Sequence, residues 1–373
     1  ANVSTSGTQL YSSAITLTAT PITLTGTTIT NSSTIAGGTN SLTITGNSVI
    51  NGAITGVNIF GVSGTTSLGA DVTTSGTQTY TGAVTLSGAD RTLTGTTIST
   101  SSTLSGDYSL TITGNAVFGD GTGTDTITLS GSSKNLSVSG TTTLNADVST
   151  SGTQTYTGAV TLATANRTLT GTTITNSSTI TGATFSLAIT GDSVINGAIS
   201  GVNVFSVSGT TNISANSIST DGTQTYSGAV TLSNSGTLTL TTTNDNISLY
   251  SIAGSGKNLT LTPGTGTISV TSTVGSSGSG LGLLVVTNSS GTTFGGAFEA
   301  EAVVLTDTTG TITFTGALTA GTLNTAVAGY NVAINGGGTI TNAATFSNTG
   351  TLTLAGTTAF TAGVTATSPS SKT

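Results

Sequence analysis

The feature that most constrains the fold of this chain is a phrase, TSGTQTYTGAVTL, that stands at residues 74–86 and again, unchanged, at residues 150–162. Related copies begin at Thr5 (TSGTQLYSSAITL) and Thr220 (TDGTQTYSGAVTL). The glycine that the copies share stands at Gly7, Gly76, Gly152 and Gly222, so the phrase recurs with a period of about 70 residues. A long period of this kind is typical of repeat architectures, in which every repeat follows the same backbone path.

The second repeat is longer than its neighbours in one stretch. The segment from Gly114 to Gly140 contains more residues than its equivalents in the other repeats, which run from Gly46 to Gly64 and from Gly191 to Gly209. The added residues lie in GDGTGTDTITLSGSSKN, and this composition, rich in Gly, Ser and Asp, is typical of turns and loops. We therefore expect stacked coils with a loop that projects outward in the second repeat.

The composition excludes an ordinary globular domain. Only 5% of the residues are charged and 4% are aromatic, His, Cys, Met and Trp are absent, and 53 of 373 residues are glycine. Low complexity raises the alternative of disorder, but disordered chains are usually charged or rich in proline. This chain has three prolines and a mean hydropathy of +0.26. An ordered protein with a thin core is the favoured interpretation.

The apolar residues follow the period of a β-strand. Pairs such as Leu42 and Ile44, or Leu238 and Leu240, alternate with Thr or Ser, as expected for a strand with one buried face. Thr suits the outward position because it is β-branched and polar. Gly, Asn-Gly and Ser-Gly close these runs, and no stretch sustains the apolar spacing of a helix. The sequence predicts an all-β fold of many short strands.

The length of the repeat distinguishes between the possible all-β architectures. A propeller blade has about 40 to 50 residues and aromatic signatures, and this sequence has neither. The observed period divides into three coils of about 23 residues, each with three short strands. The internal glycines of the first repeat, at Gly7, Gly26, Gly46 and Gly64, also allow coils of about 18 to 20 residues. We predict a parallel β-solenoid of roughly 16 coils.

The repeats divide the chain into two regions. Residues 1–232 hold three repeats of about 70 residues and part of a fourth, and residues 233–373 continue the same texture less regularly. Within the second region, residues 281–307 are more apolar and carry the only glutamates, Glu299 and Glu301. We expect this passage to form a pair of strands that are buried on both faces.

Several phrases carry a resemblance to a known family. RTLTGTT, SLTITGNAVF, LSVSGTTTLNADVSTSG and GGGTITNAATFSNTGTLTLAG resemble the repeats of very large bacterial surface proteins of the filamentous haemagglutinin type. The resemblance covers essentially the whole chain and includes no catalytic motif. It implies a secreted, right-handed parallel β-helix that forms the shaft of an adhesin or exoprotein. It implies no ligand, since other segments of such proteins normally decide what they bind.

The residues offer no catalytic site. Without Cys or His the chain has no cysteine nucleophile, no Ser–His pair and no zinc site. The twelve acidic residues are scattered and change between repeats, so that Asp90 corresponds to Pro21 and to Asn166. We predict a non-enzymatic protein with no catalytic, cofactor-binding or metal-binding residues and no cofactor.

One stretch matches a metal-binding pattern. Asp120–Thr128 (DGTGTDTIT) fits the calcium-binding nonapeptide at every position but the first. That pattern builds a site from consecutive turns, and here it occurs once, within the extra residues of the second repeat. Because Gly and Asp are also the usual residues of turns, a plain loop is the favoured interpretation.

The few charges restrict the partners. The net charge is −7 with five cations, so no basic groove exists for phosphates and nucleic acid is not expected as a partner. Arg91 and Arg167 occupy the same place in successive repeats, and we expect both at a corner on the surface because burying a guanidinium is costly. No apolar run is long enough to predict a membrane span, and the sequence shows no signal peptide.

Outward threonines in TxT runs, such as Thr23 and Thr25, raise an alternative function. A flat threonine face could bind ice or a crystalline polysaccharide if TxT were unbroken on every coil. Asn, Ser and Ala interrupt these runs. Thr as an ordinary solvent-facing strand residue is therefore the favoured interpretation.

The first coil carries no charged side chain, and the last coils carry no protecting charge or proline before Pro369 and Lys372, so we expect a piece of a longer protein whose end coils associate. The expected function is the structural shaft of a large secreted or cell-surface bacterial adhesin. The alternative is a self-assembling subunit of an extracellular filament, sheath or surface layer. The expected partners are the chain itself, end to end, or a host or neighbouring cell surface reached through other segments.

Overall fold

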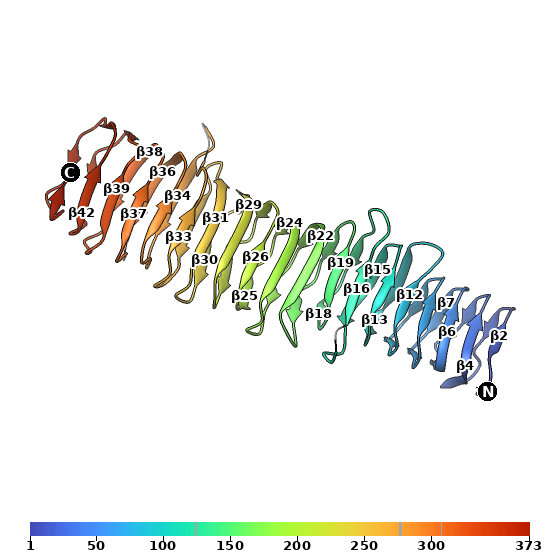
Figure 1. Cartoon of the computed structure of the whole chain (residues 1–373). Coiled ribbons are helices and arrows are strands. Elements are labelled where there is room, and N and C mark those ends of the chain that lie inside the picture. Colours follow the sequence, from blue (N-terminus) through green and yellow to red (C-terminus); the bar gives the residue numbers. More distant parts are fainter. Residues whose placement is uncertain (124, 276–277, 307) are drawn as a thin grey trace. The chain divides into compact units, whose positions relative to one another are not determined.

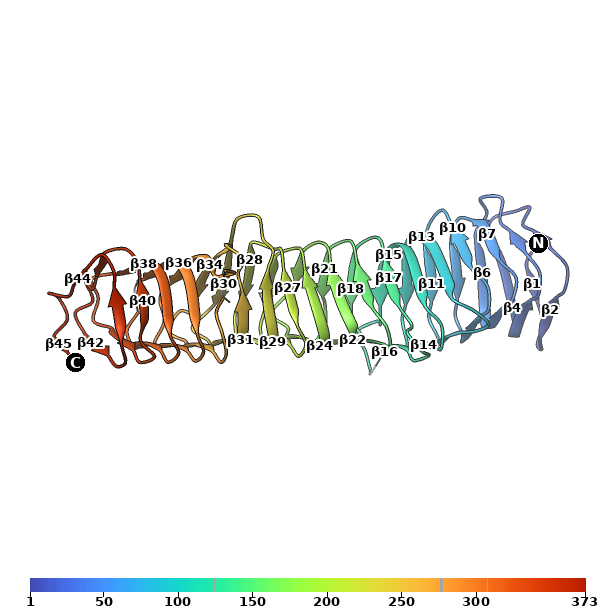
Figure 2. The same cartoon turned by 90° about the horizontal axis from the view of Figure 1, so that it is seen from above.

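The computed structural model describes residues 1–123, 125–275, 278–306 and 308–373, and in these ranges the chain forms strands and turns without a helix. Contacts divide the chain into unit 1, residues 1–185, and unit 2, residues 186–373. Within each unit, parallel strands stack coil upon coil (Figure 1 and Figure 2). The prediction of an all-β parallel β-helix is confirmed. The boundary at residue 232 follows the sequence repeats and stays a prediction.

The strands of unit 1 are short, apart from a few that bend around a corner. They are β1 (Val3–Ser4), β2 (Gln9–Tyr11), β3 (Ile15–Thr16), β4 (Ile22–Asn31), β5 (Ile35–Ala36), β6 (Leu42–Ile50), β7 (Ile54–Val57), β8 (Phe60–Val62), β9 (Thr66–Leu68), β10 (Val72–Thr74), β11 (Gln78–Tyr80), β12 (Val84–Leu86), β13 (Arg91–Thr100), β14 (Leu104–Gly106), β15 (Leu110–Phe118), β16 (Thr126–Leu129), β17 (Leu136–Val138), β18 (Thr142–Leu144), β19 (Asp147–Thr150), β20 (Gln154–Tyr156), β21 (Val160–Leu162), β22 (Arg167–Asn176) and β23 (Ile180–Thr181).

Unit 2 is built in the same way. Its strands are β24 (Leu187–Ile195), β25 (Ile199–Val202), β26 (Phe205–Val207), β27 (Thr211–Ile213), β28 (Ser217–Thr220), β29 (Gln224–Leu232), β30 (Thr237–Thr242), β31 (Ile247–Ala253), β32 (Asn258–Thr262), β33 (Ile268–Val270), β34 (Leu281–Val286), β35 (Thr292–Phe294), β36 (Phe298–Leu305), β37 (Thr311–Phe314), β38 (Leu318–Thr325), β39 (Asn331–Ile334), β40 (Gly338–Ile340), β41 (Ala344–Thr345), β42 (Thr351–Leu354), β43 (Thr358–Phe360), β44 (Val364–Thr365) and β45 (Ser371–Lys372).

Unit 1 has three faces, because every coil contributes three runs of strand. The long strand β4 bends around a corner, so its first half pairs with β1 and its second half with β2. We number the faces by the first residue of their inward-pointing ladders: face 1 starts at Val3, face 2 at Gln9 and face 3 at Ile15. The ladders are parallel and in register, so equivalent side chains of successive coils lie directly above one another.

Each coil is shorter than the division of the repeat into three predicts. Across one coil Phe60 pairs with Gln78 and Val3 pairs with Leu24, so a coil takes about 20 residues. The chain therefore forms about 18 coils rather than roughly 16. The expected coil of about 23 residues is wrong. The spacing of internal glycines is the better guide to coil length, because Gly46 and Gly64 stack directly at one corner.

One sequence repeat is shorter than four full coils, and the difference is the strand of one face. Face 2 runs from Gln9 to Val84 in four coils, through Ile29, Ser48 and Thr66. Gln78, the equivalent of Gln9 in the second repeat, precedes Val84 by one strand and lies on face 1. The third copy, Gln154, lies on face 3. Successive repeats of unit 1 therefore begin on three different faces.

The core of each unit is a stack of thin apolar layers. In β12, Val84 and Leu86 are buried while Thr85 between them is exposed, as the period of two predicts. In unit 2 the rings of Phe294 and Phe314 stack with their centroids 5.0 Å apart, and Phe298 packs edge-on against both. Each coil covers the apolar side chains of the next, so the stability of the solenoid comes from neighbouring coils.

The extra residues of the second repeat lengthen both corners that flank β16. The buried Phe118 and Ile127 are farther apart along the chain than the equivalent Ile50 and Ile54 of the first repeat. The strand itself keeps its place, since β16 pairs with β14 and β19. The insertion thus forms loops, as predicted, and leaves the order of the faces unchanged.

The expectation of strands buried on both faces within residues 281–307 is wrong. β34 and β36 are neighbouring parallel strands with one buried side, like the rest of the solenoid. Their outward residues Val285 and Val304 pair with each other and remain half-buried, and Glu301 is exposed. The extra apolar residues cover one another along the outside of the sheet. Asp307 lies outside the described residues.

Two corner positions require glycine. At Gly46 the backbone φ is +127°, and a Cβ would lie 1.9 Å from the carbonyl oxygen of Gly26 in the coil before it. Gly114 is equivalent, with a φ of +135° and a Cβ 1.8 Å from the carbonyl oxygen of Gly95. Any side chain at these corners would force the coils apart, which explains glycine at both positions.

Candidate functional site

The repeated phrase forms a buried polar cluster that we call the glutamine corner, defined in the second repeat by Thr74, Gln78 and Tyr80. Gln78 and Tyr80 are fully buried. The side-chain amide of Gln78 donates to the carbonyl oxygen of Val72 at 3.0 Å and, in the next coil, to that of Thr94 at 2.8 Å. Its Oε1 accepts the Tyr80 hydroxyl at 2.9 Å. The amide therefore ties two coils together and leaves no buried polar group of its own unpaired.

The same cluster recurs in the later copies of the phrase. The amides of Gln154 and Gln224 each donate to a carbonyl of the following coil at 2.8 Å, and they accept the hydroxyls of Tyr156 and Tyr226. Burial raises the pKa of both tyrosines. A neutral amide and a phenol can fill this corner without the desolvation cost of a charge. The phrase is repeated, and its buried Gln and Tyr are uncharged, because the corner that it builds is repeated and dry.

Side chains of Asp and Asn at the outer corners bind the backbone of the neighbouring coil. Asp71 Oδ1 accepts the N–H of Thr92 at 2.9 Å, and Asn2, its equivalent in the first repeat, accepts the N–H of Thr23 at 2.9 Å. The same bond to a following coil is made by Asn47, Asp90, Asn115, Asn135, Asp147, Asp192, Asn246 and Asn331. Asp and Asn are interchangeable here because each contributes a carbonyl-type oxygen. The exchange of Asp for Asn at this corner, as between Asp71 and Asn2, is thereby explained.

The two repeat arginines lie at the expected corner but are more covered than predicted. The side chains of Arg91 and Arg167 are 11% and 12% exposed. Arg91 Nε donates to the carbonyl of Ser87 at 3.2 Å, and its guanidinium lies 3.7 Å from Asp71. Arg167 stands 4.0 Å from Asp147. Each arginine bends over the corner toward an acid of the coil before it, the same acid that accepts the N–H of the residue after the arginine. The prediction of surface residues therefore holds only in part.

Side chains of the stretch that matches the calcium-binding pattern bind its own backbone, and its last residues, Thr126–Thr128, belong to β16. The Asp120 carboxylate accepts the backbone N–H and the hydroxyl of Thr122, each at 2.7 Å, and these bonds lower the pKa of Asp120. Asp125 accepts the N–H of Asp120 at 3.4 Å. Thr124 lies outside the described residues. Among the residues that are described, no three acidic side chains gather in the arrangement of a metal site.

The glutamates of β36 lie beside a shallow groove on the outside of unit 2. Gly256, Gly280 and Gly321 line it together with both glutamates, and the groove has a volume of about 390 Å³. Glu299 Oε1 accepts the N–H of Gly278 at 3.3 Å, which ties this side chain to a turn. The groove is lined by glycine and small side chains, and its recognisable chemistry is that of two carboxylates at an exposed strand.

The outward threonine columns are interrupted. On face 1 of unit 1 the column that starts at Thr23 and Thr43 continues through Gly61, and it meets Val117 three coils later. Because the repeats also begin on different faces, their TxT runs do not accumulate on one side of the unit. The geometry favours threonine as an ordinary outward strand residue.

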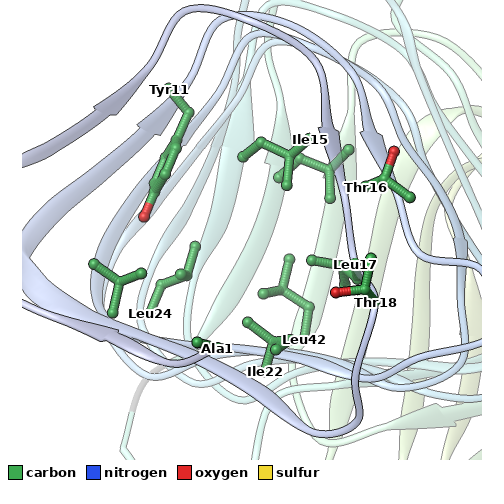
Figure 3. A pocket seen from close by; sticks show the side chains of 11 residues that line it. Ala1, Tyr11, Ile15, Thr16, Leu17, Thr18, Ile22, Leu24 and Leu42 are labelled. Carbon is green, nitrogen blue, oxygen red and sulfur yellow. The ribbon is translucent and has the colours of Figure 1, made fainter.

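The first coil of unit 1 presents a cavity of about 150 Å³ at its axial side. Figure 3 looks into this cavity, with Tyr11, Ile15 and Leu24 pointing into its interior. The side chains around it are the inward residues of the first coils. Tyr11 is half-buried, whereas its equivalents Tyr80 and Tyr156 are fully covered by the coil before them.

The fold and these clusters define the class of the protein as an all-β parallel β-helix built from tandem repeats. Comparison of the chain with models of protein families, with curated proteins and with solved structures gave no match. A search of the described residues for a helix able to cross a membrane found none.

Proposed function

We propose that the chain is the non-enzymatic shaft of a large secreted bacterial adhesin at the cell surface. The observation that carries the proposal is the use of polar side chains throughout the repeats to join one coil to the next. Glutamine amides, aspartates and asparagines are engaged with neighbouring backbone, as in Gln78 and Asp71. A protein whose polar groups serve its own axial stacking is suited to hold another segment at a distance. The resemblance to haemagglutinin-type repeats supports the same proposal.

Labelling of cells that make the protein tests this location. Antibodies against the purified chain should label intact cells, and added protease should remove the label. An intracellular protein of known abundance serves as the control for leakage. Labelling that requires permeabilised cells would contradict a surface location.

A shaft should also make no contact with the target of the adhesin. The purified chain is therefore expected neither to bind host cells nor to compete with the adhering bacteria. Saturable binding of the purified chain to cells, abolished by unlabelled chain, would show that the solenoid carries a ligand site and would contradict a purely structural role.

The second candidate is a subunit that assembles with its own copies into an extracellular filament, sheath or surface layer. The observation that favours it is that successive coils pair through parallel, in-register ladders, as Phe60–Val62 do with Gln78–Tyr80, so that copies of the chain can be joined by the same pairing. Sedimentation of the purified chain over a wide range of concentration tests this candidate. A single species at all concentrations would contradict it.

A further inference from the structure

Three asparagines of the chain are followed directly by glycine: Asn51, Asn196 and Asn335. A glycine has no Cβ to shield its backbone nitrogen, so this nitrogen can approach the carboxamide carbon of the asparagine before it. Attack by that nitrogen is the chemical route by which asparagine loses ammonia. Asn51 and Asn196 stand in the same hexapeptide, VINGAI, so a difference in their reactivity in the folded chain has to come from the fold.

The three asparagines occupy the same kind of corner. Each follows the last, buried residue of a strand, which is Ile50 in β6, Ile195 in β24 and Ile334 in β39. All three asparagine residues are exposed. Water, which completes the loss of the amide, therefore has access to each of them.

The glycine nitrogen is weakly held at two of these corners. The N–H groups of Asn51 and Gly52 share one acceptor, the carbonyl oxygen of Asn31, at 2.9 and 3.2 Å. The pair at 335–336 shares the carbonyl oxygen of Phe314 in the same way, at 2.8 and 3.4 Å. The glycine has the longer and therefore weaker bond each time. Its nitrogen is accordingly the less restrained of the two.

The asparagine side chains differ in what the following coil offers them. In unit 2 the hydroxyl of Ser214 donates to Asn196 Oδ1 at 2.6 Å. Gly69 takes the place of Ser214 in unit 1, since each follows the residue that pairs with the isoleucine of the corner. Asn51 Oδ1 lies 2.9 Å from where a Cβ of Gly69 would be, so it faces a place without a side chain. At the third corner the equivalent residue is Ala355, which has no hydroxyl.

We propose that Asn51 and Asn335 are sites of spontaneous deamidation. Asn196 is protected by the hydroxyl of Ser214. In the reaction at the first site, the nitrogen of Gly52 forms a bond to Cγ of Asn51, and the bond from Cγ to Nδ2 breaks. The departing nitrogen takes the proton of the Gly52 N–H and leaves as ammonia, and a five-membered succinimide remains. Water then opens this ring at either carbonyl and gives aspartate or isoaspartate.

The hydrogen bond from Ser214 protects because it holds the carboxamide away from the attacking nitrogen. Asn196 Oδ1 is bound to the following coil, whereas ring closure requires the carboxamide to turn toward the nitrogen of Gly197. That turn breaks the hydrogen bond. The expected effect is a reaction about fivefold slower, the ratio given by ~1 kcal/mol for one hydrogen bond.

Both products change the corner in which they form. Each carries a negative charge that asparagine lacks, and isoaspartate also lengthens the main chain by one carbon. At the first site this backbone is bound twice to the coil before it, because Asn31 accepts the N–H of Asn51 and donates its amide to the carbonyl oxygen of Gly52 at 2.7 Å. Isoaspartate at this corner moves those groups out of register. A chain that is not replaced therefore weakens with age at two defined corners, whatever its function.

Peptide mass spectrometry of the folded chain, incubated in mildly alkaline buffer, measures the reaction at each asparagine. Methylation by an isoaspartyl methyltransferase identifies isoaspartate among the products. Asn51 should convert about fivefold faster than Asn196. In the chain unfolded by urea the two should convert equally fast, because their hexapeptides are identical. The ratio of folded to unfolded rates at Asn335 should match the ratio at Asn51.

Exchange of the neighbouring residues provides the matched variants. Gly69→Ser should supply the missing hydroxyl and slow Asn51 about fivefold, while Asn335 is unchanged. Ser214→Gly should raise the rate at Asn196 to that at Asn51. Circular dichroism shows whether each variant keeps the fold. Equal rates at Asn51 and Asn196 in the folded chain, or a rate at Asn196 that does not respond to Ser214→Gly, would overturn the protection, and intact Asn51 and Asn335 after Asn196 has reacted would overturn the proposal as a whole.

Discussion

Replacement of Gln78 by leucine should be among the most damaging conservative changes in unit 1. Leucine fits the volume of the site but donates and accepts nothing. The carbonyl of Val72 and the hydroxyl of Tyr80 then lose the amide inside a corner that water does not reach, and the carbonyl of Thr94 keeps only the Thr74 hydroxyl at 3.3 Å. Each buried group left unpaired costs about 1–3 kcal/mol, so we expect a loss of about 4 kcal/mol in the free energy of unfolding.

A double-mutant cycle separates this effect from a simple change in packing. Tyr80→Phe alone leaves only the Gln78 Oε1 without its donor and should cost about 1–2 kcal/mol. In the double variant the orphaned hydroxyl is absent, so the combined loss should fall short of the sum by about 1 kcal/mol or more. Unfolding in urea followed by tyrosine fluorescence measures all three, and hydrogen exchange over residues 72–100 shows whether the loss is local.

Gln9→Leu in the first coil is the matched control. The same bonds are made there, but Tyr11 is half-exposed, so water can replace the lost amide. The expected loss is about 1 kcal/mol. Equal losses at Gln9 and Gln78, or strict additivity in the cycle, would refute the view that the dry corner makes the phrase indispensable.

Three other perturbations test the corners, the buried tyrosines and the repeat. Gly46→Ala should lower the free energy of unfolding, followed by heating, by about 3 kcal/mol or more, because the added Cβ has no room and the backbone φ is +127°. Gly61→Ala, where the space around the Cβ is open, should leave it unchanged. Burial raises the pKa of Tyr80, Tyr156 and Tyr226, so their stabilising effect should be complete below pH ~10, where tyrosine in the unfolded chain ionises. Above that pH the free energy of unfolding should fall by up to ~1.4 kcal/mol per pH unit for each tyrosine. Ionisation of these three tyrosines without a change in circular dichroism would contradict this. Deletion of residues 74–149, one whole repeat, should leave the unfolding midpoint in urea nearly unchanged, because residues 154–162 then rest on residues 60–68. Deletion of residues 60–77, one coil, should lower that midpoint, because it removes the Phe60–Tyr80 contact, which is worth about 0.5–1.5 kcal/mol beyond its buried area.

The sequence predicts the class of the fold well because two of its signals are local. Alternation of apolar residues with Thr, as in Val84–Leu86, depends on neighbours two positions apart and appears directly as buried and exposed sides. Glycine at the corners is equally local. These signals identify the strands, the turns and the parallel stacking without knowledge of distant contacts.

The coil length is harder to predict, because the most visible period belongs to the phrase and not to the coil. A repeat of about 70 residues invites division into whole coils, yet the glutamine corner can start on any of three equivalent faces. Nothing in the phrase at Gln78 states which face it occupies. The smaller spacing between stacked glycines such as Gly46 and Gly64 reports the coil itself.

The glutamine corner could not be derived from the pattern alone. Gln78 and Tyr80 follow the inward period, but glutamine is a residue that is usually exposed. Its burial depends on the carbonyl of Thr94, one coil away, which sequence spacing does not reveal when the coil length is uncertain. The arginine corner is more covered than expected for a related reason, since the position of Asp71 relative to Arg91 also depends on coil length.

The change of face from one repeat to the next gives unit 1 the symmetry of a screw. Gln9, Gln78 and Gln154 point along three directions in turn, so an outer loop copied with each repeat is shown to the surroundings from every side. An antibody against one such loop would find its epitope on whichever side it approached. Duplication of a repeat thus lengthens the solenoid without giving it a front and a back.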